Sequence, residues 1–413
     1  MEKTGREERF AMTPRSLLLV AAAFILITCT IVSAGLPGDP DSDGVITRDE
    51  LAGQVIAAME SGKPLSGQEF QDLRDAAWIY LHWDGKARTV TDSTGRAVTL
   101  SRPLRRIIVM NSETLETMRS LGVGRESVIA VDKYNAHKPE FFPEYAGYPS
   151  VGSVWAPDYE KIISLQPDAI FLYASVSTAE CDEIEKRVKT SLPGTAVFRF
   201  DCYLPETYLG DSQNIARIFG REHDFERLSE FYTQALGKVK RVAAAGDPPL
   251  VYLETWNDFK SASRGSGYHD KITMAGGTNI FADSAAEYPE VDPESIIARK
   301  PDVIVKLAGS GKYIFGGYSG ENSTRFAEVY NAILARPGWN SLPAVRNGRV
   351  YVLHNGILGG PQYIIGVTYM ARWFHPQQAA DLDPEGLHRR YLEEFQGLAP
   401  SLARPDMFIY PVD

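Results

Sequence analysis

The chain has 413 residues, which is enough for two lobes of ordinary domain size and a further segment. Hydrophobic residues make up 44% and charged residues 23% of it, a composition typical of a soluble globular protein with a full core. The formal net charge of -10 argues against a general nucleic-acid binder, which needs a basic surface, although a local group of arginines could still bind an anionic ligand.

Residues 1–35 are expected to form a signal peptide or membrane anchor and to lie outside the fold. Arginines precede an uncharged run at residues 17–34, an order that is typical of an export signal. The run ends in small residues suited to cleavage, while residues 26–29 resemble a lipoprotein box with an unusual Thr28. Whether Met1 or Met12 is the start, and whether the signal is cleaved, lipidated or retained, stays open. The remainder is expected at the cell surface or in the periplasm.

Residues 39–50 match an EF-hand calcium loop at every diagnostic position. The predicted ligands are the carboxylates of Asp39, Asp41, Asp43 and Glu50 and the backbone carbonyl of Val45. Calcium is a hard cation that prefers such an oxygen-only shell. Apolar residues at helical spacing predict helices over 51–59 and 68–82. Because the export signal ends just upstream, the segment at 36–87 resembles a dockerin-type half-module, with an acidic linker as the alternative.

From about residue 88 the sequence alternates strands and helices, which indicates a parallel sheet. Residues 89–100 alternate around a short turn and predict a hairpin. Further on, the pattern predicts a buried strand at 106–110, a helix at 113–121 and another strand at 128–131.

The segment at 160–170 recurs at 294–304, with a constant offset of 134 residues. In each copy a helix begins at an acid, Glu160 or Glu294, and ends before a Pro-Asp pair that leads into an apolar strand. Two copies predict two similar lobes, unless the match is a coincidence between ordinary helix–strand junctions.

An amphipathic helical stretch at 212–246 lies between the copies. It predicts a long helix that joins a lobe at 88–211 to a second lobe at 247–413. The expected fold class is therefore α/β, with two Rossmann-like lobes joined by a long helix and preceded by a small helical calcium-loop segment.

A series of short motifs follows in order over residues 89–397. They are Thr91-Asp92, Gly95-Arg96, Val151-Gly152-Ser153, Ala275-Gly276-Gly277-Thr278-Asn279, Pro337-Gly338-Trp339, Asn347-Gly348-Arg349-Val350-Tyr351 and His375-Pro376. Together they resemble the iron-chelate and vitamin-B12 periplasmic-binding family, the helical-backbone class of ABC transporter solute-binding proteins. The resemblance implies two lobes with the ligand between them, and a permease with its ATPase as partners. It also implies that Glu160 and Glu294 contact the permease, and their alternative role is that of helix-start acids without a partner.

The ligand is expected at the carboxyl ends of the strands and in the loops beyond them. Candidates in those loops are Asn111, Lys133, Tyr134, Trp155, Tyr173, Tyr203, Trp256, Arg264 and Tyr268, with Tyr288 and Asn355 as further ones. Aromatic faces suit a large planar or chelate ligand, and an arginine could pair with a carboxylate or an oxyanion. The family implies an iron chelate, such as a siderophore or haem, or a corrinoid. The alternatives are an oxyanion such as molybdate or tungstate, a secreted enzyme, or a non-transport surface receptor.

Residue types that bind metals or carry out catalysis are sparse or scattered. The seven histidines show no paired spacing, which argues against transport of a bare metal ion. Neither a Walker phosphate loop nor a Gly-x-Ser-x-Gly elbow is present, so we expect a binding protein, a monomer, and no enzyme. Cys29 lies in the apolar run. Cys181 and Cys202 follow the predicted strands at 171–173 and 197–200, and we expect them to form a disulfide in an oxidising compartment. Two free buried thiols are the alternative.

Overall fold

A computed structural model describes residues 35–320 and 323–412 of the chain. By its internal contacts the chain divides into two compact units, with the boundary between Lys86 and Ala87. The predicted export signal and Cys29 lie outside the described residues. Within the described ranges, no helix is long and apolar enough to cross a membrane.

The described part of the first unit contains two helices, α2 (Arg48–Glu60) and α3 (Gly67–His82), which confirm the helices predicted from apolar spacing. Each begins with a capping box, in which a hydroxyl and a glutamate satisfy backbone N–H groups that the helix itself leaves free. The backbone N–H of Ile46 donates to the carbonyl of Gly85 at 2.7 Å. The loop before α2 is therefore tied to the chain that follows α3.

The second unit opens with an antiparallel hairpin, β1 (Arg88–Thr91) and β2 (Ala97–Leu100), followed by the first lobe. The parallel sheet of this lobe has the spatial order β4 (Val128–Val131), β3 (Ile107–Val109), β7 (Ala169–Leu172) and β8 (Ala196–Arg199). The other elements of the lobe are α4 (Ser112–Ser120), α5 (Tyr159–Ser164), α6 (Thr178–Ser191) and a small ribbon of β5 (Gly152–Ser153) and β6 (Ala156–Pro157). Strands β3, β7 and β8 are buried throughout, as expected for parallel strands covered on both faces.

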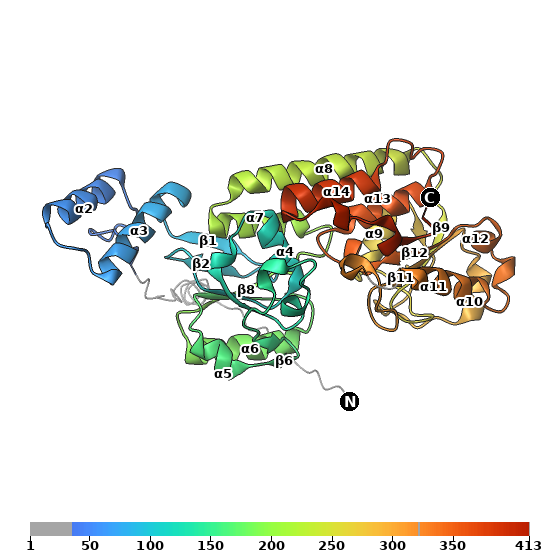
Figure 1. Cartoon of the computed structure of the whole chain (residues 1–413), viewed down its shortest axis with the longest axis horizontal. Coiled ribbons are helices and arrows are strands. Elements are labelled where there is room, and N and C mark those ends of the chain that lie inside the picture. The colour runs from blue at the N-terminus through green and yellow to red at the C-terminus, as the bar shows by residue number, and fades with distance from the viewer. Residues whose placement is uncertain (1–34, 321–322, 413) are drawn as a thin grey trace, which may run out of the picture. The chain divides into compact units, whose positions relative to one another are not determined.

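Two consecutive helices connect the lobes (Figure 1). The first, α7 (Tyr208–Phe219), ends at Gly220, whose left-handed backbone lets the chain turn. The second, α8 (Glu222–Ala244), has 23 residues and is therefore about 35 Å long. Its buried stripe includes Leu228, Tyr232 and Val239, and it packs on α7 and on α13 (Tyr363–Phe374) of the second lobe. The predicted joining helix is thus confirmed.

The second lobe repeats the architecture of the first. Its sheet has the order β10 (Thr278–Asn279), β9 (Leu250–Glu254), β11 (Val303–Ala308), β12 (Val350–His354) and β13 (Ile409–Tyr410), with only β13 antiparallel. Its α-helices, besides α13, include α9 (Tyr268–Met274), α10 (Pro293–Arg299), α11 (Thr324–Leu334), α12 (Pro343–Arg346) and α14 (Pro384–Gln396). The order β10-β9-β11-β12 matches β4-β3-β7-β8 position by position.

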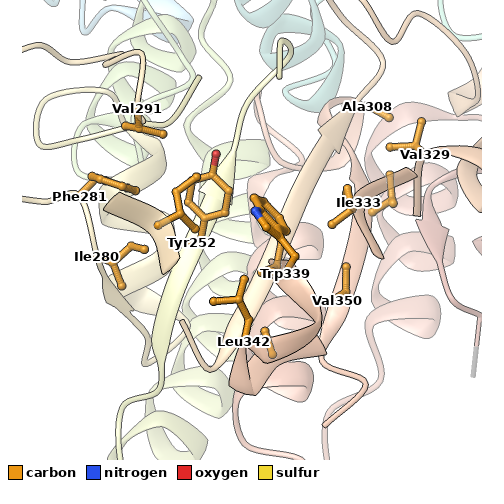
Figure 2. Close-up of a cluster of buried hydrophobic side chains, with 14 of the residues drawn as sticks. Tyr252, Ile280, Phe281, Val291, Ala308, Val329, Ile333, Trp339, Leu342 and Val350 are labelled. Carbon is orange, nitrogen blue, oxygen red and sulfur yellow. The ribbon is translucent and has the colours of Figure 1, made fainter. Parts of the chain in front are cut away.

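The core of the second lobe is an aromatic and aliphatic cluster on its sheet (Figure 2). The ring of Tyr252 lies edge-on to Phe281 at 5.9 Å and to Trp339 at 6.1 Å between centroids. Edge-to-face packing of this kind stabilises a core beyond the burial of area alone. The lobe therefore has a core of its own.

The internal repeat has a structural basis at the two Pro-Asp pairs. The side chain of Asp168 accepts hydrogen bonds from the backbone N–H groups of Arg105 and Arg106 at 2.8 and 2.9 Å, just before β3. The side chain of Asp302 accepts one from Leu250 at 2.9 Å, at the start of β9. Each aspartate thus fixes its own strand against the preceding one in the same sheet, which explains why both copies keep it.

The predicted disulfide is not formed in this structure, where both cysteines are free and buried. Cys181 lies in α6 and belongs to the hydrophobic cluster of the first lobe, together with Ile184 and Val188. The sulfur of Cys202 instead accepts a hydrogen bond from the Thr114 hydroxyl of α4 at 3.7 Å. The two sulfur atoms are therefore held against different helices, a separation that spacing along the chain did not reveal.

Candidate functional site

Loops at the carboxyl ends of the strands of both lobes enclose two adjoining cavities, of about 490 and 200 Å³. We call them the larger and the smaller cavity. Both are lined by Glu113 of the first lobe and by Asn355 and Gly359 of the second. This is the edge at which parallel α/β sheets bind their ligands.

The smaller cavity is rich in tyrosine. It is lined by Glu113, Tyr173, Val176, Tyr203, Ser266, Tyr268, Lys271, Tyr288, Asn355 and Gly359. Each tyrosine hydroxyl already has a partner: Tyr173 donates to Glu113 at 2.9 Å, Tyr268 to Asn355 at 2.6 Å and Tyr288 to the Ser266 carbonyl at 3.1 Å, and the Tyr203 hydroxyl lies 2.7 Å from that of Ser175. These bonds fix the rings in place, and a donating hydroxyl oxygen can still accept a bond from a ligand.

Lys271 is the cationic group of the smaller cavity and is 1% exposed. Its ammonium lies 5.1 Å from the ring centroid of Tyr268 and 5.8 Å from that of Tyr363. Burial lowers the pKa of Lys271 to about 7, against the opposing attraction of Asp270 and Glu113. Among the residues that the structure describes, none forms a salt bridge or a hydrogen bond with this ammonium.

The larger cavity is lined by glycines and by a neutral histidine. Burial, with a smaller effect of Lys138, lowers the pKa of His354 to about 4. The Nδ1 atom accepts a hydrogen bond from the Gly356 N–H at 3.0 Å, so the proton of the neutral ring lies on Nε2. A Cβ atom at Gly309 or Gly317 would collide with the imidazole, so these positions require glycine. The glycine-rich segment after β11 thus packs closely around a side chain of the site.

A hydrogen-bonded network beside the larger cavity connects α4 of the first lobe to α14. Glu116 accepts a bond from the Tyr391 hydroxyl at 2.6 Å, and Gln396 donates to the Ser120 hydroxyl at 2.6 Å. The Nε of Arg119 donates to Gln396 at 2.7 Å. Burial raises the pKa of Glu116 to about 7, although the Tyr391 bond and the charge of Arg119 oppose the change.

Eight of the nine predicted ligand contacts fall into three groups. Tyr173, Tyr203 and Tyr268 line the smaller cavity, as do the further candidates Tyr288 and Asn355. Trp256 is half-buried and lies 5.0 Å from the Tyr288 ring, while the side chain of Arg264 is exposed. Lys133, Tyr134 and Trp155 form an exposed group, with the two rings 6.1 Å apart and the ammonium 5.0 Å from the tyrosine ring. Contact of any of these residues with a ligand stays a prediction.

Asn111 has a structural role in this geometry. It is completely buried, and its side-chain oxygen accepts a bond from the Thr114 N–H at 2.7 Å, capping α4. Its amide donates to the Phe200 carbonyl at 3.1 Å. Asn111 thereby fixes the helix whose first turn carries Glu113 into both cavities.

Sequence reasoning missed Lys271. In the sequence it follows Asp270 in a short polar helix and has the pattern of a solvent-facing residue. It is buried because α9 packs against α8 and α13. His269, two residues before Lys271, lies 3.4 Å from the Asn279 amide.

The two glutamates of the internal repeat occupy equivalent places. Glu160 lies in the first turn of α5 and Glu294 in the first turn of α10, and both are exposed. Each helix is capped by an aspartate, Asp158 or Asp292. The geometry thus places one exposed carboxylate on each lobe at matching positions.

The acidic loop of the first unit brings carboxylates together. Oxygens of Asp39, Asp41 and Asp43 lie within 4.8 Å of one another. One oxygen of Asp39 and one of Glu50 are buried and have no hydrogen-bond partner. The second Glu50 oxygen accepts bonds from the N–H and the hydroxyl of Thr47, at 2.8 and 2.7 Å. Such an arrangement offers oxygen ligands to a hard cation.

Comparison with known proteins gives consistent matches. The chain is 23% identical over 273 residues to YhfQ of Bacillus subtilis, named as a candidate ABC transporter substrate-binding lipoprotein, which covers 63% of this chain and 79% of that protein. It is 24% identical over 202 residues to the vitamin B12-binding protein of Yersinia pestis, covering 48% of this chain and 68% of that one. The TroA-like periplasmic binding protein FepB of Veillonella parvula has a similar fold, with a TM-score of 0.66 and 24% identity over 75% of this chain and 97% of that one. A model of the periplasmic binding protein family matches residues 107–356, more than half of the chain, and the chain therefore belongs to that family.

Proposed function

We propose that the chain is the exported substrate-binding protein of an ABC importer, which captures an iron chelate or a corrinoid and delivers it to the permease and its ATPase. The observation that carries the proposal is the pair of cavities between two similar lobes, lined by aromatic and polar side chains from both. The relatives support it, because one is named as a candidate transporter subunit and another as a vitamin B12-binding protein.

The chemistry of the cavities favours a chelate over a small polar solute. Four tyrosines offer broad apolar faces with polar tips, which suit the mixed surface of an organic metal complex. A cavity of about 490 Å³ lies in the range that protein pockets use for drug-sized ligands. Neutral His354 adds an N–H donor without adding charge.

Titration of tryptophan fluorescence with a ferric trihydroxamate, ferric citrate, haemin and cyanocobalamin tests the proposal. Trp256 lies beside Tyr288 of the smaller cavity and should report binding, so Trp256→Phe should reduce the signal. We expect one class of chelate to saturate at one equivalent. Absence of saturable binding by every chelate, from a folded protein, would contradict the proposed ligand class.

We propose further that Glu160 and Glu294 dock the protein on its permease. Two exposed carboxylates at equivalent positions of two lobes can fix the orientation of a partner with matching cations. Glu160→Arg and Glu294→Arg should leave chelate affinity intact and lower substrate-stimulated ATP hydrolysis by the reconstituted transporter, with the double variant lowest. Glu180→Arg, in the first turn of α6, is the matched control. Equal stimulation by all variants would leave the two glutamates as helix-start acids only.

We propose that the loop at 39–50 binds one structural calcium ion through Asp39, Asp41, Asp43, Glu50 and the carbonyl of Val45. The two buried oxygens without a partner support this assignment, because a cation would satisfy both. Calorimetry should detect one site that is lost in Asp41→Ala. Asp49→Ala, an exposed acid of the same loop, is the control. Unchanged calcium binding by Asp41→Ala would exclude this ligand set.

A further inference from the structure

Two lysines are almost completely buried in the second lobe, and only one of them is neutralised. Lys306 is 0% exposed, lies 3.0 Å from a Glu254 oxygen and donates to the carbonyls of Thr255 and Asn257 at 2.7 and 3.0 Å. Lys271 is 1% exposed and has no such partner among the described residues. A buried ammonium without a counter-ion is energetically costly. The site of Lys306 contains its counter-ion, Glu254, and the site of Lys271 lacks one among the described residues.

We propose that Lys271 is the anchor for an anionic oxygen of the transported ligand, so that the site selects metal chelates that carry a free carboxylate. The inference rests on the proposed receptor function and names the class of chelate. The missing counter-ion of Lys271 would then arrive with the ligand, in the cavity that this residue lines.

The surroundings of Lys271 leave the cavity as the direction from which an anion can approach. The rings of Tyr268 and Tyr363 lie near the ammonium and stabilise a cation only weakly, through their faces. The acids that act on its pKa are Asp270, on the same helix, and Glu113, which belongs to the other lobe. Neither comes within salt-bridge distance, so the fold itself leaves this charge unpaired.

Glu113 limits how much negative charge the ligand can bring. Its carboxylate lines both cavities and already accepts the Tyr173 hydroxyl. A ligand with anionic groups all around would meet this carboxylate, whereas one with a carboxylate on a single edge can face Lys271 and turn its neutral body towards the tyrosines. Haem propionates and carboxylate siderophores have this chemistry, and neutral trihydroxamate chelates lack it.

The test compares Lys271→Met with wild type and with Lys240→Met, a control in which an exposed lysine of α8 is replaced in the same way. Haemin and ferric citrate are the carboxylate-bearing probes, and a ferric trihydroxamate and cyanocobalamin are the probes without a free carboxylate. We expect wild type to bind a carboxylate-bearing probe and Lys271→Met to bind it about tenfold to a hundredfold more weakly, the effect of losing one charge-assisted hydrogen bond. Lys240→Met should bind it as wild type does.

Thermal unfolding of the ligand-free proteins separates a binding role from a structural one. Removal of an unpaired buried charge should leave the melting temperature of Lys271→Met equal to or above that of wild type. A lower melting temperature together with equal weakening for all probes would overturn the inference. So would a wild type that binds only chelates without a carboxylate, an outcome that leaves the receptor function intact. Failure of wild type to bind any probe would instead count against the receptor function itself.

Discussion

Replacement of Glu254 by glutamine should destabilise the second lobe more than most single substitutions. Glu254 is completely buried at the end of β9 and is the common anion of two cations. Arg336 donates to both of its oxygens at 2.8 Å, and Lys306 lies 3.0 Å away. It also accepts bonds from the Tyr252 hydroxyl at 2.9 Å and the Phe259 N–H at 3.0 Å. Glutamine keeps the shape and removes the charge.

The expected loss is about 3 kcal/mol at neutral pH, the lower end of the range for breaking a buried ion pair from one side. The lower end applies because Asp258 still accepts a bond from Arg336 at 3.2 Å, and Lys306 keeps its two carbonyl partners. In a Glu254→Gln, Lys306→Met double variant one stranded cation is gone. The double variant should therefore lose less unfolding free energy than the two single variants lose together.

The effect also has a predicted pH dependence. Burial alone would raise the pKa of Glu254, but the Arg336 hydrogen bond and the charges of Lys306 and Arg336 outweigh it and hold the pKa below the ordinary 4.5. Since the folded pKa is the lower one, the contribution of this carboxylate is complete above the unfolded pKa and is lost as the pH falls through the folded value. The gap between wild type and Glu254→Gln should thus be full at pH 7 and shrink below about pH 4.

Urea unfolding followed by tryptophan fluorescence measures these free energies for wild type, both single variants and the double variant. If the free energy of unfolding of Glu254→Gln lies within about 1 kcal/mol of that of wild type at pH 7, the ion pairs of Glu254 contribute no more than exposed ion pairs do. The role assigned to Glu254 would then be wrong. Exactly additive losses in the double variant would contradict the coupling between Glu254 and Lys306.

Two other predictions concern buried groups of the first lobe. Glu116→Gln should stabilise the protein by up to about 3 kcal/mol at pH 8 and have no effect near pH 4. The reason is that a folded pKa of about 7 makes wild type lose stability as the pH rises from 4.5 to 7. The same difference in melting temperature between variant and wild type at both pH values would refute this. Unfolded, unreduced mature protein should yield two reactive thiols, from Cys181 and Cys202. The native protein should react slowly with a thiol reagent, because burial raises the pKa of both thiols. A count of zero thiols in the unfolded protein would contradict the structure.

The architecture could be predicted from sequence where local pattern and long-range order agree. Glu160 and Glu294 begin repeated segments, and the repeat corresponds to the same strand order in both lobes. The apolar stripe of α8 is long enough to specify a joining helix without any tertiary information. In both cases the same sequence pattern recurs over many residues, so the prediction does not depend on any single side chain.

The candidate site could be predicted only in part, because the burial of single side chains depends on packing between distant elements. Tyr173, Tyr203 and Tyr268, predicted from their positions beyond strands, line the smaller cavity, and their contact with a ligand stays a prediction. Asn111 comes after a strand in the same way, yet it turns inward and caps a helix. Lys271 is not among the sequence-based candidates, because its burial depends on the packing of α9 against α8 and α13. The cysteines were paired wrongly for the same reason: proximity along the chain does not tell which helix each sulfur meets.

Native mass spectrometry of protein purified from its own host, with a visible spectrum of the same sample, tests whether this chain is a receptor for a metal chelate. We expect one bound species per chain, with either the isotope pattern of iron or the mass of a cobalt corrinoid, and with the visible absorbance of such a chelate. Release of that species on unfolding, and its rebinding on refolding, would place it in the folded site. A bound species without a metal, such as a sugar, peptide or amino acid, would contradict the account.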